Sequence, residues 1–245
     1  MTDASIADDP VAGAAGEPAA AAGRPLEPAF PAWGLLWRSV VSTLGIMSVV
    51  AAPWAGVWFY RWFAGNLALP GGRPLRLDAE AGASGLLFAA MGLSSWLEDG
   101  LGDLVDRTPA LVISVLVEAA LWAWLIRWLI PRLAADDGAT RFGFRGSFAG
   151  LVAWTILFYA GVVSLIGWAW ALKNGLRWAA ARIEGPVSVE FRASGAAILG
   201  RTALMLLVCL PIVTIPWALR SWTNWLFSQF FVGERPGGAP ATTAV

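Results

Sequence analysis

The feature that most constrains the fold is a series of five long apolar segments. They cover residues 35–63, 82–97, 109–130, 148–172 and 195–217. A bilayer core about 30 Å thick requires roughly 20 apolar residues per spanning helix, because an unpaired backbone amide finds no water there. The pattern predicts an all-α integral membrane protein: a bundle of about five transmembrane helices with short β segments on one membrane surface.

Composition agrees with this prediction and excludes other classes. Hydrophobic residues make up 58% of the chain and charged residues 14%, with 17 basic and 17 acidic side chains. This balance leaves no net field to attract nucleic acid, so we expect no nucleic-acid partner. The expected location is the inner (plasma) membrane, as a multi-pass protein, with the lipid bilayer as its first partner.

The chain divides by composition into tails and membrane units. We predict a disordered acidic tail rich in Ala and Pro at 1–32, a first membrane unit at 33–107, a central transmembrane helix at 108–132, a second membrane unit at 133–232 and a disordered tail at 233–245. Pro53, Pro211 and Pro216 predict kinks or breaks in their segments. Residues 221–232, rich in Trp and Phe, predict an amphipathic helix at the membrane interface.

Three polar connections alternate apolar and polar residues. They are residues 74–80, 141–146 and 186–192. Alternation with period two, bounded by Gly or Pro, is typical of strands. We expect these strands to pair with one another as a cap on one membrane surface, and the alternative is that they are ordinary loops.

A motif of the form W-A-x5-R-W occurs twice and predicts an internal repeat. Its copies are Trp54-Ala55 with Arg61-Trp62, and Trp170-Ala171 with Arg177-Trp178; a third copy, Trp217-Ala218 with Asn224-Trp225, replaces Arg by Asn. Trp58 lies in the middle of the first copy. Indole rings suit the boundary between headgroups and acyl chains, and an adjacent Arg can extend to a phosphate, so we expect these residues to contact lipid or a partner protein. The alternative is a stacking platform for a lipid or aromatic ligand.

A resemblance accompanies these residues. The order Thr43-Leu44-Gly45-Ile46, then Pro53-Trp54-Ala55, an Arg and a short alternating strand resembles the YjgN-like family, bacterial inner-membrane proteins with a domain of unknown function. Residues 142–146, Phe-Gly-Phe-Arg-Gly, resemble the strand element of that family. The chain departs from the family in having about one extra helical turn between the first two motifs. The resemblance implies a helical bundle in a bacterial inner membrane and no established activity.

Among the charged residues inside the apolar segments, three are candidates for a role within the membrane. Glu118 lies near the centre of 109–130, Arg201 about two turns into 195–217 and Arg38 one turn into 35–63. A carboxylate at the bilayer centre costs about 2.5–3.5 kcal/mol unless it is paired, protonated or hydrated. Glu118 therefore predicts either an interhelical pair that stabilises packing or a cation or proton site on a transport path.

The charges of the connections conflict with five simple crossings. The connection at 98–107 has four acids and one base, whereas the other three connections are basic, so the acidic connection should face out. Five crossings would put the equally basic fourth connection on the wrong side. We therefore expect one segment, 82–97 or part of 148–172, to be re-entrant or split. The acids of 98–107 lack the spacing of a calcium loop, and we expect no metal site and no cofactor.

These observations favour a protein that is not an enzyme. The chain contains no His and only one Cys, Cys209, which removes the usual general base and any His-based triad. The first hypothesis is a non-enzymatic scaffold or accessory subunit of a membrane assembly, bound to another membrane protein or to a second copy. The alternatives are a small transporter or channel that uses Glu118 and Arg201, and a lipid-binding or lipid-handling protein.

Overall fold

The computed structural model describes residues 23–97, 100, 107–135 and 140–234. The helices are α1 (Ala32–Met47), α2 (Ala52–Gly65), α3 (Gly85–Ser94), α5 (Arg107–Leu129), α6 (Phe148–Val163), α7 (Gly167–Ala180), α8 (Gly195–Val208) and α9 (Ile215–Ser228), with short 3-10 turns η1 (Ile130–Arg132) and η2 (Ile212–Thr214). The strands are β1 (Arg24–Pro25), β2 (Glu27–Pro28), β3 (Leu67–Leu69), β4 (Arg73–Leu77), β5 (Leu133–Ala135), β6 (Gly143–Phe144), β7 (Ile183–Glu184), β8 (Val187–Phe191) and β9 (Phe230–Glu234).

The predicted bundle of about five transmembrane helices is wrong. Among the described residues, only the helix Thr108–Arg132 is long and apolar enough to cross a membrane. Three of the apolar segments each contain two shorter helices: 35–63 is divided between α1 and α2, 148–172 between α6 and α7, and 195–217 between α8 and α9. The expected split within 148–172 is therefore present, but it is one of three. Hydropathy averaged over a segment cannot distinguish one long helix from two that turn back.

The fold is also not all-α, because the strands form three antiparallel sheets. Their orders are β1-β9-β8, β2-β3-β4-β5 and β6-β7. The three alternating connections do contain strands, namely β4, β6 and β8. They do not pair with one another as predicted: β4 lies between β3 and β5, β6 pairs with β7, and β8 pairs with β9. The partners of β4 and β6 are strands of only two or three residues, and β9, the partner of β8, lies in a stretch that begins within the predicted interfacial helix.

Parts of the predicted tails belong to the fold. Residues 1–22 and 235–245 lie outside the described residues, but β1 pairs with β9, β2 pairs with β3 and the side chain of Phe30 is fully buried. The predicted interfacial helix at 221–232 is also wrong in its bounds. Its first part continues α9, and its second part is β9, which pairs with β8.

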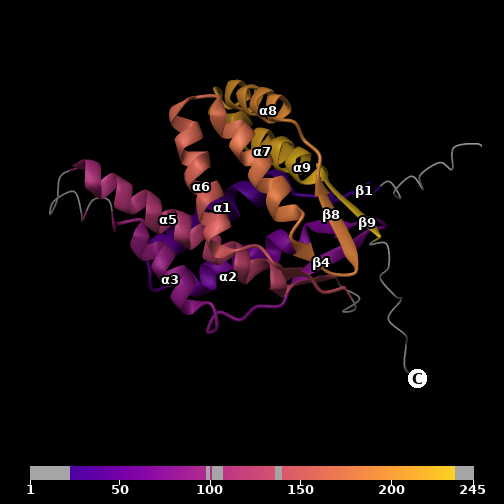
Figure 1. Cartoon of the computed structure of the whole chain (residues 1–245), viewed down its shortest axis with the longest axis horizontal. Helices are drawn as coiled ribbons and strands as arrows, with labels where there is room; N and C mark the ends of the chain where they lie inside the picture. Colours follow the sequence, from indigo (N-terminus) through magenta and orange to yellow (C-terminus); the bar gives the residue numbers. More distant parts are fainter. Residues whose placement is uncertain (1–22, 98–99, 101–106, 136–139, 235–245) are drawn as a thin grey trace, which may run out of the picture.

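The helices form a closed ring. Each described helix packs against the next along the chain, from α1 through α9, and α9 packs against α1. In Figure 1 the strands β4, β8 and β9 gather on one side of the molecule, whereas the outer end of α5 and the connection between α6 and α7 lie away from them. The chain therefore separates a strand side from a helical side.

The order of elements occurs twice. A helix pair, two strands, a second helix pair and one strand follow one another as α1-α2-β3-β4-α3-α5-β5 and again as α6-α7-β7-β8-α8-α9-β9. Backbone hydrogen bonds recur with the same spacing. The Ala29 amide donates to the Asn66 carbonyl, and the Arg145 amide donates to the Arg182 carbonyl.

Three apolar clusters hold the ring together. One joins α2, α3, β4 and α5 around Phe88 and Trp128, a second lies around Phe30 between the strands, and a third joins α7, α8, α9 and β8 around Ile198. Phe88 is fully buried and packs edge-on against Trp128 with 5.3 Å between ring centroids. A Cβ added to Gly56 would lie 2.4 Å from the Phe88 ring, so the absence of a side chain at Gly56 allows α2 and α3 to approach.

Candidate functional site

The turns between paired helices have a distinctive geometry. Between α1 and α2, Val49 adopts a left-handed conformation with φ 59°, and between α6 and α7, Leu165 does the same with φ 63°. The preceding serine stabilises each turn: the Ser48 hydroxyl donates to the Gly45 carbonyl and accepts from the Ala51 amide, and Ser164 makes the equivalent bonds to Gly161 and Gly167. Such a conformation is costly for branched residues, so the turns are specified structures.

The turns expose apolar side chains. Val50 is 81% exposed, Val163 85% and Leu165 82%. The turn between α8 and α9 exposes Leu210 and Ile212 to a similar extent. The Thr214 hydroxyl donates to backbone carbonyls in this third turn, including that of Pro211. A soluble protein normally places polar residues and glycine at such positions.

Exposed large apolar side chains are confined to the helical side. Among the described residues they lie on the helices and on the turns between paired helices, and none lies on a strand. In the 18-residue apolar stretch of the helix Thr108–Arg132, only 28% is buried inside the protein. Soluble proteins usually expose large apolar side chains singly or in small patches. We call this surface the apolar face.

The Trp-rich motif divides into an exposed part and a packed part. Trp54, Trp170 and Trp217 are exposed on the apolar face, and Trp58 is just over one third exposed. The second Trp of each copy is packed instead. Gly34 contacts the Trp62 ring, Gly150 contacts the Trp178 ring and Trp225 packs beside the α7–α9 cluster. The predicted contact residues Trp62, Trp178 and Trp225 are therefore parts of the helix packing.

The residue before each packed Trp forms a clasp, which we define as its polar contact with the segment that enters another helix pair. The Arg61 Nη2 donates to the Ala79 carbonyl before α3, and the Arg177 Nε donates to the Phe191 carbonyl before α8 at 3.1 Å. The Asn224 Oδ1 accepts from the Phe30 amide before α1 at 3.3 Å. The prediction that an adjacent Arg can extend to a phosphate did not include these contacts with the backbone.

Sequence analysis missed a fourth clasp at Arg127. Its Nη1 donates to the Gly146 carbonyl, before α6, at 2.8 Å. Trp128 follows it and is only 6% exposed. The Arg-Trp dipeptide was the available signal, but the Trp-Ala part of the motif is missing from α5. The clasps thus join the second helix of each pair to the entry of another pair.

The predicted charged residues inside the apolar segments lie apart from one another. The Tyr159 hydroxyl donates to Glu118 Oε2 at 2.6 Å. Arg201 on α8 lies over the Trp225 ring of α9, 5.4 Å from its centroid, and Arg38 lies over the rings of Trp58 and Trp62. Within the described residues, Glu118 forms no ion pair with either Arg. The two charges proposed for a transport path are therefore not brought together.

An apolar groove opens between α5, α6 and α7. Its volume is about 360 Å³, and its lining includes Trp122, Trp154, Phe158 and Leu172. Tyr159, which bonds to Glu118, also lines it. The groove could hold an apolar chain with a polar group near Tyr159.

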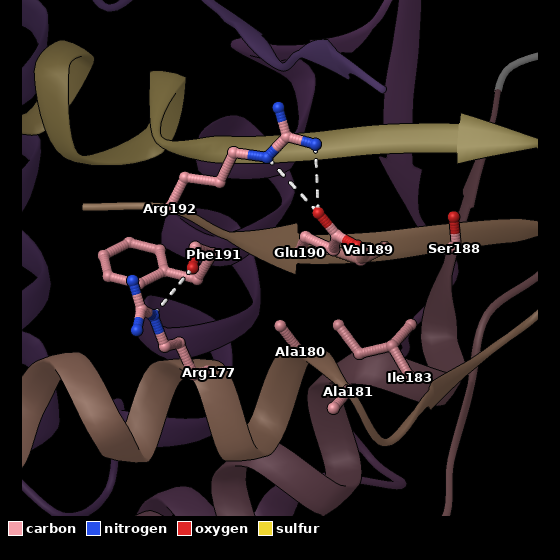
Figure 2. A pocket seen from close by; sticks show the side chains of 9 residues that line it. All are labelled: Arg177, Ala180, Ala181, Ile183, Ser188, Val189, Glu190, Phe191 and Arg192. Carbon is pink, nitrogen blue, oxygen red and sulfur yellow. Dashed lines mark hydrogen bonds and ion pairs between the residues drawn. The ribbon is translucent and has the colours of Figure 1, made fainter. Parts of the chain in front are cut away.

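A more polar pocket lies where α7 meets β8. Its volume is about 520 Å³, and it contains the side chains of Arg177, Ser188, Glu190 and Arg192. Figure 2 shows Arg177 bonded to the Phe191 carbonyl and Arg192 paired with Glu190 at 3.0 Å. No group of three His, Cys, Asp or Glu side chains in the described part of the chain could hold a metal ion.

Comparison with known proteins adds no relative. No family model, no curated protein and no solved structure matches the chain. The resemblance to the YjgN-like family therefore stays a prediction.

Proposed function

We propose that this chain is a non-enzymatic scaffold of a bacterial inner (plasma) membrane. In this proposal the paired helices α1–α2, α6–α7 and α8–α9 enter the bilayer and return to the same side, and the sheets lie at the membrane surface. The observation that carries it is the confinement of exposed large apolar side chains to helices and their turns. Replacing the water around such a surface by lipid lowers the free energy of the system.

Helix length supports partial insertion of the pairs. Helix α6 has 16 residues and α7 has 14. At 1.5 Å per residue they extend about 21–24 Å, which is less than the hydrocarbon thickness of about 30 Å. A pair of this length that turns at Ser164 returns to the surface where it started.

Charge distribution supports the same arrangement. The basic connections that conflicted with five simple crossings all contribute to the strand side, because each intervening pair turns back. Arg76, Arg141 and Arg182 can then share one aqueous side, as the positive-inside rule requires. The acidic connection at 98–106 lies largely outside the described residues.

A scaffold fits these features better than a transporter. The clasps connect successive helix pairs into one ring, and this ring presents an apolar face of Trp, Leu and Val to its surroundings. Glu118 and Arg201 belong to different helix pairs and have different partners. Its partners in this proposal are lipid and either another membrane protein or a second copy of this chain.

The test is the accessibility of single cysteines in membrane vesicles. In a Cys209→Ser background, Leu165→Cys probes the turn between α6 and α7, and Ala181→Cys probes an exposed position at the strand side. In inside-out vesicles, whose outer surface is the side that carries the basic connections, a membrane-impermeant maleimide should label Ala181→Cys and leave Leu165→Cys unlabelled until SDS is added. Both positions are exposed in the protein, so protection of Leu165→Cys must come from lipid or from a partner within the membrane. Equal labelling of the two positions in intact and in opened vesicles would refute insertion.

The groove between α5, α6 and α7 favours a second candidate, a lipid-binding protein. Gly175 lies in the groove lining, and a Cβ added there would be 3.6 Å from Trp154, an ordinary contact. Gly175→Leu should fill the groove, whereas Gly65→Leu adds the same side chain at a site with no atom within 4 Å. Lipid retained by the purified protein, measured by mass spectrometry, should fall for the first variant only. Unchanged retention in both would contradict a lipid-binding groove.

A further inference from the structure

Several arginines at the helix ends bond to carbonyl oxygens and not to carboxylates. Among the described residues, these are Arg61, Arg127, Arg132, Arg177 and Arg182, which we call the arginine belt. A carbonyl accepts a hydrogen bond without neutralising the unit charge, and a guanidinium carries five donors. The partial negative charge of a helix C-terminus offsets about half of one charge. The belt therefore retains a net positive field.

The belt lies next to the apolar face along α2 and α5. Trp58 precedes Arg61 by about one turn on α2, and Trp124 precedes Arg127 by about one turn on α5. Both Trp side chains are partly exposed on the apolar face, and β3 or β5 follows the arginine within a few residues. If lipid surrounds the apolar face, one helical turn of about 5.4 Å separates the Trp rings from the guanidinium groups. In membrane proteins, Trp rings likewise lie at the membrane–water interface, and Arg side chains lie farther out, at the level of the lipid phosphates.

The pocket at α7 and β8 shows how a belt residue is presented. The Nε of Arg177 is engaged by the Phe191 carbonyl, which orients the guanidinium. Its two Nη atoms form no hydrogen bond with the described residues, and the pocket around them has a volume of about 520 Å³. A planar guanidinium held in this way can donate two parallel hydrogen bonds to a phosphate.

We propose that the arginine belt binds the phosphate groups of anionic phospholipids around the inserted helices. This inference rests on the proposed insertion, and it adds the class of lipid. Phosphatidylglycerol should be preferred over phosphatidylcholine, because the belt attracts a net negative headgroup. Phosphatidylcholine is zwitterionic and gains little from a positive field.

The test uses the full chain reconstituted in phosphatidylcholine vesicles with trace spin-labelled lipids. Electron paramagnetic resonance measures the fraction of each labelled lipid whose motion is restricted by contact with the protein. Restricted phosphatidylglycerol should exceed restricted phosphatidylcholine by about two- to fivefold, and salt near 1 M should remove most of this difference. Equal restriction of the two lipids at low salt would refute the inference but leave insertion intact. Absence of any restricted lipid would refute insertion itself.

Variants separate the belt from other positive charges. Arg127→Gln with Arg177→Gln removes two belt charges and keeps a side-chain amide that can donate to the carbonyl at each clasp. The matched control is Arg201→Gln, because Arg201 lies over Trp225 within the helical side. The belt variant should lower the phosphatidylglycerol preference at least twofold, and the control should not. An equal loss of phosphatidylglycerol preference in both variants would refute the belt as the binding site. Should the belt variant fail to fold, the salt series on the unaltered chain still shows whether positive charge causes the preference.

Discussion

Val163→Asp tests whether the turn between α6 and α7 lies in lipid. Val163 is 85% exposed, so in water the substitution leaves folding nearly unchanged, within about 0.5 kcal/mol. In a bilayer, Val162, Val163, Leu165 and Ile166 each favour insertion by about 0.3–0.6 kcal/mol, or about 1–2 kcal/mol together, whereas an aspartate at depth costs about 2.5–3.5 kcal/mol. The substitution should therefore reverse the preference of the turn for lipid.

The assay combines this change with the cysteine probe at the same turn. In the Cys209→Ser, Leu165→Cys chain, adding Val163→Asp should convert a protected cysteine into one that an impermeant maleimide labels in intact vesicles. The matched control, Ala181→Asp, introduces the same charge at an exposed strand-side position and should leave Leu165→Cys protected. If Val163→Asp changes neither labelling nor carbonate extraction, the turn is not in lipid and the reasoning from exposed apolar residues fails.

Three further predictions concern stability, measured as the temperature at which the detergent-solubilised protein loses its monodisperse peak. Gly56→Ala should destabilise the protein by about 1–3 kcal/mol, because the new Cβ meets the buried Phe88 ring. The control Gly65→Ala has open space around the new Cβ and should be neutral or stabilising. Equal midpoint temperatures for the two variants would contradict the close packing of α2 and α3. Val49→Gly should stabilise the protein by up to about 1 kcal/mol, because glycine adopts the left-handed conformation of this position without strain. Val50→Gly, at the next position, should not stabilise it. A higher midpoint temperature for Val50→Gly than for Val49→Gly would exclude strain at this turn. Asn224→Ala should lower the stability by about 1–3 kcal/mol, because it leaves the Phe30 amide without its acceptor. Asn224→Asp keeps an acceptor and should lower the stability less. Identical losses of stability in the two variants would argue against the clasp.

The motif around Trp and Arg could be found in the sequence, but its role could not. Spacing alone revealed the copies at Trp54 and Trp170, and it predicted one environment for all of their aromatic rings. In the structure the first Trp of each copy is exposed, although the Trp170 ring also lies beside Gly195, and the second packs against a glycine of the preceding helix, Gly34 or Gly150. A glycine that receives an indole ring comes from another helix, so no local pattern identifies the contact. The clasp at Arg127 was missed for the same reason, since its acceptor, the Gly146 carbonyl, is distant in the chain.

The isolated charges illustrate a similar division. Hydropathy identified Glu118 as an acid within an apolar helix, but its hydrogen-bond donor is Tyr159 on α6, 41 residues away. Arg38 and Arg201, the other two candidate charges of the apolar segments, each lie over the face of an indole ring. Residue type indicated that these charges need partners, and only the packing of helices decided which groups they meet.

Composition and periodicity by themselves determined that the chain has long apolar segments, short alternating segments between them, breaks at its prolines and a repeated Trp motif, because these properties are local. Tertiary structure decided that most apolar segments are paired helices and that β1 and β2 join the sheets. It also decided that β5 and β9, rather than the other alternating segments, pair with β4 and β8. The physical reason is that a turn at Ser48 or Ser164 needs only one residue with positive φ, which apolar averages do not detect. Strand partners, for their part, are selected by contacts between residues far apart in the chain.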